Sequence, residues 1–209
     1  MSTTTTGDLE VVIPEGSEVQ VVELDGGTEI VVEAPVSDLE VDVTGTGIVA
    51  GKKVDDSTVN VKAFKGESAT VVLQSTKFVG SDINVSGGGK GVVKVNTGVF
   101  NKSTVTGGKK ADSVRFGNET KVRNAEVDCG KGNDTVTFKK NTTFKGKTTV
   151  DLGKGGKDSL VLKANKVKGG KLVVENFGKK DTITAGKNSF DYKDIKGGAE
   201  ISGVKIELA

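Results

Sequence analysis

Short runs in which apolar and polar residues alternate follow one another along most of the chain. Residues 39–43, 59–63 and 125–129 are clear examples, and the two-residue period is typical of β-strands with one buried face. A glycine cluster follows each of these runs and precedes a second one, as at residues 134–138. The chain has 33 Val and 9 Leu, and β-branched side chains favour strands over helices. The pattern predicts a protein built almost entirely of strands.

A third, shorter element follows in each unit and is marked by one large apolar residue. The separations between successive markers are 22, 22, 22, 23 and 23 residues, for Phe78, Phe100, Val122, Phe144, Val167 and Phe190, with Val36 and Val54 as earlier members. Three strands per unit of about 22 residues predict an all-β, three-sided parallel β-helix (a β-solenoid) of about eight coils. Stacking of coils would place Phe116 against Phe138. An antiparallel β-sandwich is the alternative, because turns 8–12 residues apart also fit that class.

The repeats do not extend to either end of the chain. We expect residues 1–15 to be a flexible, threonine-rich start followed by a capping strand, residues 16–198 to form the solenoid, and residues 199–209 to form a capping hairpin. Both prolines, Pro14 and Pro35, precede the regular repeats, which suits stacked strands because proline cannot donate to a central ladder. Solenoids need such caps to prevent edge-to-edge association.

The glycine corners in the second half of the chain share a Gly/Lys-rich loop, then an Asp, then a strand. The clearest copy is CGKGNDTV at residues 129–136. The four Asp residues are Asp112, Asp134, Asp158 and Asp181, and they are 22, 24 and 23 residues apart. Each therefore takes the same place on successive coils.

Over residues 85–200 these corners resemble the RTX family, whose glycine-rich nonapeptide repeats bind calcium in β-rolls. The resemblance implies that Asp112, Asp134, Asp158 and Asp181 are calcium ligands. The chain departs from the family because the motif occurs once per coil and every loop carries lysine. The same residues also suit a structural role, in which glycine supplies positive φ, Asp bonds the following backbone, and lysine offsets the charge of the Asp column. Both interpretations stay open.

Composition and charge exclude several functional classes. Without histidine and with one cysteine, the chain has no Ser-His-Asp triad, no His-ligated zinc and no intrachain disulfide. Cys129 is expected to be a buried small hydrophobe. Residues 1–51 hold 11 acidic and no basic residues, whereas the rest holds 30 basic and 17 acidic. Of the basic residues 28 are Lys, and this scarcity of Arg argues against nucleic-acid binding.

The short, evenly spaced turns leave no insertion long enough to wall a catalytic cleft. We therefore expect a non-enzymatic structural or attachment protein with protein partners, no small-molecule substrate and no membrane insertion. Degenerate RTX-like repeats are similar to those in some bacteriophage structural proteins. This resemblance implies a component of a larger assembly, such as a virion (a capsid decoration or fibre protein), that can also self-associate, and the charge asymmetry fits it. The alternative is a secreted, extracellular RTX-like calcium-binding protein. The N-terminus lacks the basic and apolar regions of a signal peptide, which fits both.

Overall fold

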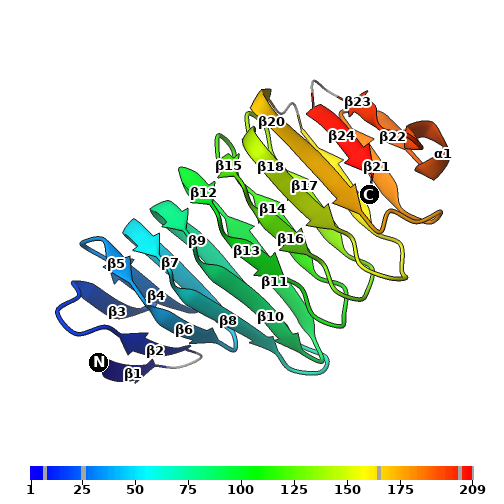
Figure 1. Cartoon of the computed structure of the whole chain (residues 1–209). Helices are drawn as coiled ribbons and strands as arrows, with labels where there is room; N and C mark the ends of the chain where they lie inside the picture. Colours follow the sequence, from blue (N-terminus) through cyan, green and yellow to red (C-terminus); the bar gives the residue numbers. More distant parts are fainter. Residues whose placement is uncertain (7–8, 25–26, 164–165, 202–203, 209) are drawn as a thin grey trace.

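Strands from successive repeats lie side by side in parallel and build a β-solenoid of about seven turns. The computed structural model describes residues 1–209 except 7–8, 25–26, 164–165, 202–203 and 209. Figure 1 shows the coils stacked in sequence order, from the N-terminal strands at one end to the C-terminal strands at the other. In-register parallel pairing runs through the body, for example Val114↔Val136 and Val127↔Val150. The predicted fold class is confirmed, and the antiparallel sandwich is excluded.

The strands form three flat faces, which the chain visits in the same order in every coil. Face 1 consists of β6 (Glu40–Val43), β8 (Thr58–Ala63), β10 (Asp82–Gly87), β13 (Thr104–Thr106), β16 (Glu126–Asp128) and the second halves of β18 (Thr143–Asp151) and β20 (Lys166–Glu175). Face 2 consists of β4 (Gly27–Val32), the first halves of β7 (Thr46–Asp55) and β9 (Ser68–Val79), then β11 (Lys90–Val95), β14 (Ser113–Phe116), β17 (Thr135–Phe138), β19 (Ser159–Leu162) and β21 (Thr182–Ala185). Face 3 consists of β5 (Val36–Ser37), the ends of β7 and β9, then β12 (Val99–Asn101), β15 (Lys121–Arg123) and the starts of β18 and β20.

Inward-facing side chains stack in columns along the solenoid axis. Phe116 stacks on Phe138 with ring centroids 4.7 Å apart, as the spacing predicts. Phe78 stacks on Phe100 at 6.1 Å, and edge contacts join the two pairs of rings to each other and to Phe144. All five rings are fully buried. Offset stacking and edge-to-face packing add to the burial of apolar surface, so this continuous aromatic column stabilises the register of the coils.

The two ends depart from the parallel stack. At the N-terminus β1 (Ser2–Thr6) and β2 (Leu9–Ile13) form an antiparallel hairpin, β2 joins β6 antiparallel, and β3 (Val19–Leu24) pairs antiparallel with β4. The threonine-rich start, expected to be flexible, is thus a strand, since β-branched Thr residues suit pairing with β2. These antiparallel strands also explain why the regular stack has about seven turns and not eight.

Phe190 does not continue the column of large apolar residues. It lies on β22 (Asn188–Phe190), which pairs antiparallel with β21 and places Phe190 opposite Ile183. The chain reverses at Gly186, whose φ of +63° suits the first position of a two-residue hairpin turn. The remaining C-terminal elements are α1 (Tyr192–Ile195), β23 (Ala199–Ile201) and β24 (Val204–Leu208).

The C-terminal end is covered by a further hairpin. β24 pairs parallel with β20 and antiparallel with β23, within the residues 199–209 for which a hairpin was predicted. Helix α1 begins with a capping box, in which Asp191 accepts from the backbone of Asp194 and Asp194 accepts from the backbone of Asp191. No helix among the described residues is long and apolar enough to span a bilayer.

The glycine corners provide a test of coil stacking. Gly153 and Gly155 lie in one loop with φ of +78° and +87°, but a Cβ on Gly153 would strike the carbonyl oxygen of Gly130 on the preceding coil, whereas a Cβ on Gly155 meets nothing within 4 Å. We expect Gly155→Ala to cost about 1–2 kcal/mol from backbone strain alone. Gly153→Ala should cost about 1–3 kcal/mol more, because the coils must separate. Urea denaturation measures both, and equal costs would contradict the contact.

Candidate functional site

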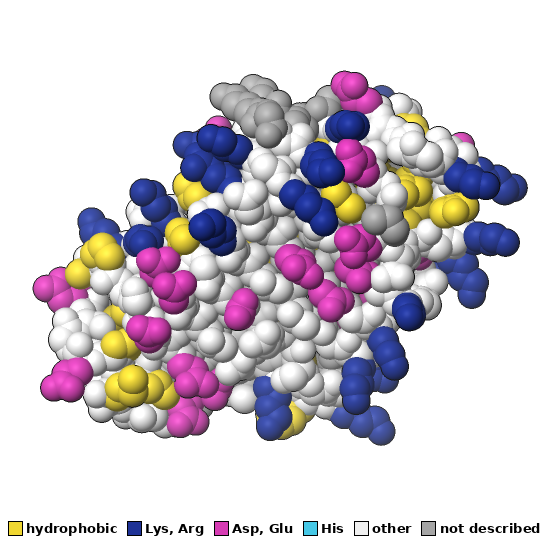
Figure 2. Space-filling model, in the orientation of Figure 1, with side chains coloured by type: hydrophobic (Ala, Val, Ile, Leu, Met, Phe, Trp, Pro, Cys, Tyr) yellow, Lys and Arg dark blue, Asp and Glu magenta, His cyan; other side chains and the backbone are white. Residues whose placement is uncertain are grey.

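The corner where face 1 turns into face 2 collects the four aspartates that the repeat pattern singles out. Each precedes a strand of face 2, and each side chain is at most 5% exposed, although its loop is rich in exposed lysine. Figure 2 shows the basic side chains gathered along this edge of the rod. The structure therefore brings together Asp112, Asp134, Asp158 and Asp181 as one buried column.

Hydrogen bonds along this column run from one coil to the next. The backbone N–H of Asp112 donates to Oδ1 of Asp134 (2.7 Å), and the N–H of Asp134 donates to Oδ1 of Asp158 (2.7 Å). The N–H of Asp158 donates in turn to Oδ1 of Asp181 (2.9 Å). Gly91 starts the column, because its N–H donates to Oδ1 of Asp112 (2.8 Å). Each carboxylate thus satisfies a corner N–H that the β-ladders do not reach.

The second carboxylate oxygen has a partner only at the two ends of this column. Oδ2 of Asp112 accepts from Gly108 N–H (2.6 Å), and Oδ2 of Asp181 accepts from Gly178 N–H (2.6 Å). In the described structure, Oδ2 of Asp134 and Oδ2 of Asp158 are buried without a hydrogen-bond partner. An unpartnered buried carboxylate oxygen is costly, because it loses water and gains nothing in return.

A competing carboxylate explains the two unpartnered oxygens. In the middle coils, the face 1 strand ends in Asp128 or Asp151, and these side chains accept the glycine N–H themselves, from Gly130 (2.9 Å) and Gly153 (2.8 Å). The strand positions in register with these two, before and after them in the stack, are Thr106 and Glu175. In those two coils the loop glycine donates to the buried aspartate, so its Oδ2 is satisfied.

Burial sets the protonation of the column. Loss of hydration raises the pKa of the Asp134 carboxyl to about 7 and that of Asp158 to about 6, against 3.8 in an exposed Asp, and it also raises the pKa of Asp112. Neighbouring aspartates raise the pKa of Asp134 further, while the N–H of Asp112 acts in the opposite direction. A proton on Oδ2 of Asp134 removes the charge that burial disfavours.

The hydrogen bonds correct one expectation about these aspartates. The structural interpretation assigned each Asp to the following backbone of its own loop, but Oδ1 bonds the equivalent residue on the preceding coil. The loop sequence alone does not reveal this partner, because the donating N–H comes from the neighbouring coil and reaches Oδ1 only when the coils stack. The calcium interpretation stays a prediction. Among the described residues, no group of three or more His, Cys, Asp or Glu side chains is placed to hold a metal ion.

A second column with the same geometry lies where face 3 turns into face 1, and the sequence reasoning missed it. The N–H of Ser57 donates to Oγ of Ser81 (3.0 Å), and the N–H of Ser81 donates to Oγ of Ser103 (3.1 Å). The signal was present as serines 24 and 22 residues apart. Cys129 is 2% exposed, and burial together with nearby aspartates raises the pKa of its thiol, so the thiol stays protonated and inert.

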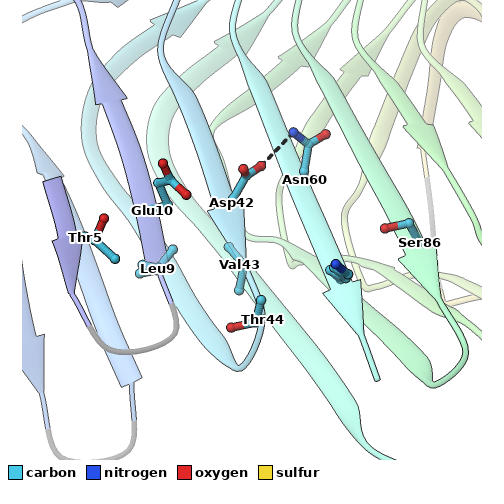
Figure 3. A pocket seen from close by; sticks show the side chains of 9 residues that line it. Thr5, Leu9, Glu10, Asp42, Val43, Thr44, Asn60 and Ser86 are labelled. Atoms are coloured by element: carbon cyan, nitrogen blue, oxygen red, sulfur yellow. Dashed lines mark hydrogen bonds between the residues drawn. The ribbon is translucent and has the colours of Figure 1, made fainter. Parts of the chain in front are cut away.

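A hollow of about 360 Å³ lies on face 1 where the antiparallel β2 joins β6 (Figure 3). Glu10 and Asp42 sit directly opposite each other in the β2–β6 register, and Oδ1 of Asp42 accepts from Nδ2 of Asn60 (2.7 Å). Asn60 Oδ1 accepts in turn from Nδ2 of Asn84 (3.2 Å). This carboxylate pair could not be predicted from the sequence, because it depends on β2 joining the sheet antiparallel.

Comparisons with protein-family models, with curated proteins and with solved structures find no match for this chain.

The raised pKa values predict that the protein is less stable at high pH. Between pH 4 and pH 7 the unfolded chain releases a proton that native Asp134 retains, so the free energy of unfolding falls as pH rises through this window. Asp134→Asn keeps the Oδ1 acceptor and removes the charge. We expect it to remove a loss of unfolding free energy on the order of a few kcal/mol between pH 4 and pH 7. Chemical denaturation across this pH range measures the effect.

The exposed Asp82→Asn on face 1 is the matched control, and it should leave the slope unchanged. If Asp134→Asn and Asp82→Asn change the pH dependence of the unfolding free energy equally, the buried aspartate column is not its source.

Proposed function

We propose that this chain is a non-enzymatic structural or attachment protein that forms part of a larger assembly, such as a bacteriophage virion in which it would serve as a capsid decoration or fibre protein. The observation that carries the proposal is a stack of coils with charge separated along its axis. Residues 1–51, which hold 11 acidic and no basic residues, lie at one end of the stack, and the lysine-rich coils lie beyond them (Figure 2). A charge-polarised rod suits attachment between two unlike surfaces.

The surface of the rod supports the same proposal. Its outward positions recur from coil to coil in fixed register, so the rod offers a long, regular row of side chains to a partner. Such repeated contacts add up without a deep pocket, as in other solenoid proteins that bind along their length.

Sedimentation tests the proposal directly. In extracts of the native source at low salt, the chain should migrate with a large particle on a sucrose gradient, and immunogold should label that particle. Salt near 1 M should release it as the free 21.6 kDa chain, because screening weakens surface electrostatics. A chain that sediments as the free protein at every salt concentration would contradict the proposal.

A secreted, extracellular RTX-like calcium-binding protein is the second candidate function. The observation that favours it is the pair of buried, unpartnered oxygens, Oδ2 of Asp134 and Oδ2 of Asp158, beside the glycine loops. Carboxylate and carbonyl oxygens are the ligands that calcium takes. The exposed lysines of these loops oppose it, and for this reason we place it second.

Thermal unfolding in calcium against unfolding in chelator separates the two candidates. Binding to the native state at 100 times Kd adds about 2.7 kcal/mol of stability, and Asp134→Asn combined with Asp158→Asn should abolish that gain. If calcium does not change the unfolding temperature, the calcium-binding function is contradicted and the assembly proposal is unaffected.

A further inference from the structure

The N-terminal end of the stack leaves one edge of two strands unpaired. Among the described strands, β1 pairs only with β2, and β3 pairs only with β4. Because β2 joins β6 and β4 joins β7, β1 is the last strand of face 1 and β3 is the last strand of face 2 (Figure 1). An unpaired edge presents backbone N–H and C=O groups that can bind a further strand.

The pairing of β3 with β4 identifies which backbone groups of β3 are free. The N–H of Glu33 donates to the carbonyl oxygen of Glu18 (2.9 Å), so these opposite residues, directly before β3 and after β4, are a hydrogen-bonded pair. Bonded and non-bonded pairs alternate along antiparallel strands, which makes Gln20 the next residue of β3 that bonds β4. The N–H and C=O groups of Val19 and Val21 therefore point away from β4, toward the open edge.

The side chains of the same two valines lie at the unfinished end of the core. Val19 pairs with Val32 and Val21 pairs with Ile30, and both partners on β4 are buried. Val19 and Val21 pack against the core but are only partly buried. A strand added beside β3 would remove more of this apolar surface from water, which favours its binding.

A hollow of about 470 Å³ adjoins the start of β3. Its wall includes the partly buried side chains of Ile13, Pro14 and Val19 and the exposed side chain of Glu15. Ser2, the first residue of β1, also lines it, so the hollow lies between the starts of the two unpaired strands. It offers an apolar surface beside a carboxylate to a side chain of an added strand.

The charge around this end is entirely acidic. Residues 1–51 contain no Lys or Arg, and Glu15, Glu18 and Glu33 are exposed near β3. Glu15 lies 3.8 Å from the amino group of Met1, and in the described structure no Lys or Arg side chain forms a salt bridge with any of the three. Figure 2 shows acidic and hydrophobic side chains, and no basic ones, at this end of the visible face. The edge of β3 therefore suits a positively charged partner.

The C-terminal end of the stack is better protected. Its last strands, β22 and β23, have three residues each, whereas β3 has six. Helix α1 follows β22, with Ile195 buried and the ring of Tyr192 stacked on Phe177 (6.4 Å). Short edge strands and covering helices block strand addition in native proteins, as do Lys and Pro on the edge. β3 contains neither Lys nor Pro.

We propose that the open edge of β3 binds an extended, basic segment of a protein partner as an additional strand of face 2. The backbone groups of Val19 and Val21 bond the added strand, and its alternate apolar side chains cover these valines. Its Lys or Arg side chains meet Glu15 and Glu18. β1 suits this role less, because its residue in register with buried Val11 is the polar Thr4. The site rests on the proposed function, since it names the kind of partner that the acidic end of the rod contacts.

The experiment uses a short synthetic peptide of alternating Val and Lys, added to the purified chain at low salt, with amide hydrogen exchange as the measurement. Bound peptide should slow exchange of the Val19 and Val21 N–H groups at least tenfold. It should leave the N–H of Gln20, which already bonds β4, unchanged. The same peptide with an N-methylated backbone keeps its charge but cannot donate, so it should bind at least tenfold more weakly.

Two double variants of the chain test the charge of the site. Glu15→Lys with Glu18→Lys should weaken peptide binding at least tenfold. Asp82→Lys with Glu126→Lys makes the same change in net charge at exposed positions of face 1, far from β3, and should bind as the parent chain does. Equal losses in the two variants would overturn the proposal, because attraction would then depend on net charge alone.

The exchange pattern decides the remaining alternatives. Protection of β1 amides in place of those of β3 would overturn the assignment of the edge. Protection of Val19 and Val21 in the parent chain alone, at high concentration, would show that a second copy fills the edge and would also overturn it. A peptide that binds none of these strands contradicts the site, whereas sedimentation of the chain with a large particle would still support the assembly.

Discussion

The hydrogen bond from the backbone of one coil to the next is the interaction on which this fold depends. Along the three faces, the parallel β-ladders make it. At two corners the backbone turns away from ladder geometry, and side chains complete the bonding. Serine does so where face 3 meets face 1, and aspartate does so where face 1 meets face 2. In both columns the N–H of one coil donates to the equivalent side chain of the following coil, so the repeat of about 22 residues enforces its own register.

The two columns use different chemistry for one task, and the difference has consequences. A serine hydroxyl is neutral and also donates to a carbonyl two residues earlier, as Ser81 does to Val79. An aspartate brings a charge into a dry corner. Asp134 and Asp158 are left with one oxygen unsatisfied, because Asp128 and Asp151 accept the nearby glycine N–H. The aspartate corner is therefore the part of the rod whose stability depends most on pH, or on a cation if one binds there.

Much of the body could be predicted from the sequence, because stacked coils convert a linear period into spatial columns. The positions of Phe116 and Phe138 alone predicted their contact. The ends could not be predicted in the same way, because local turns decide them: Gly186 reverses the chain and removes Phe190 from its column. The backbone N–H that donates to each corner aspartate lies one coil away, so the loop sequence alone predicts the wrong donor.

Amide hydrogen exchange tests the central claim, which is that corner side chains of one coil bind the backbone of the coil before. The N–H groups of Asp112, Asp134 and Asp158 lie in loops but donate to buried carboxylates. We predict that they exchange as slowly as the strand amides of the core, through global unfolding only. Exchange as fast as that of an exposed loop amide would contradict the account, because the columns would then not hold the coils in register.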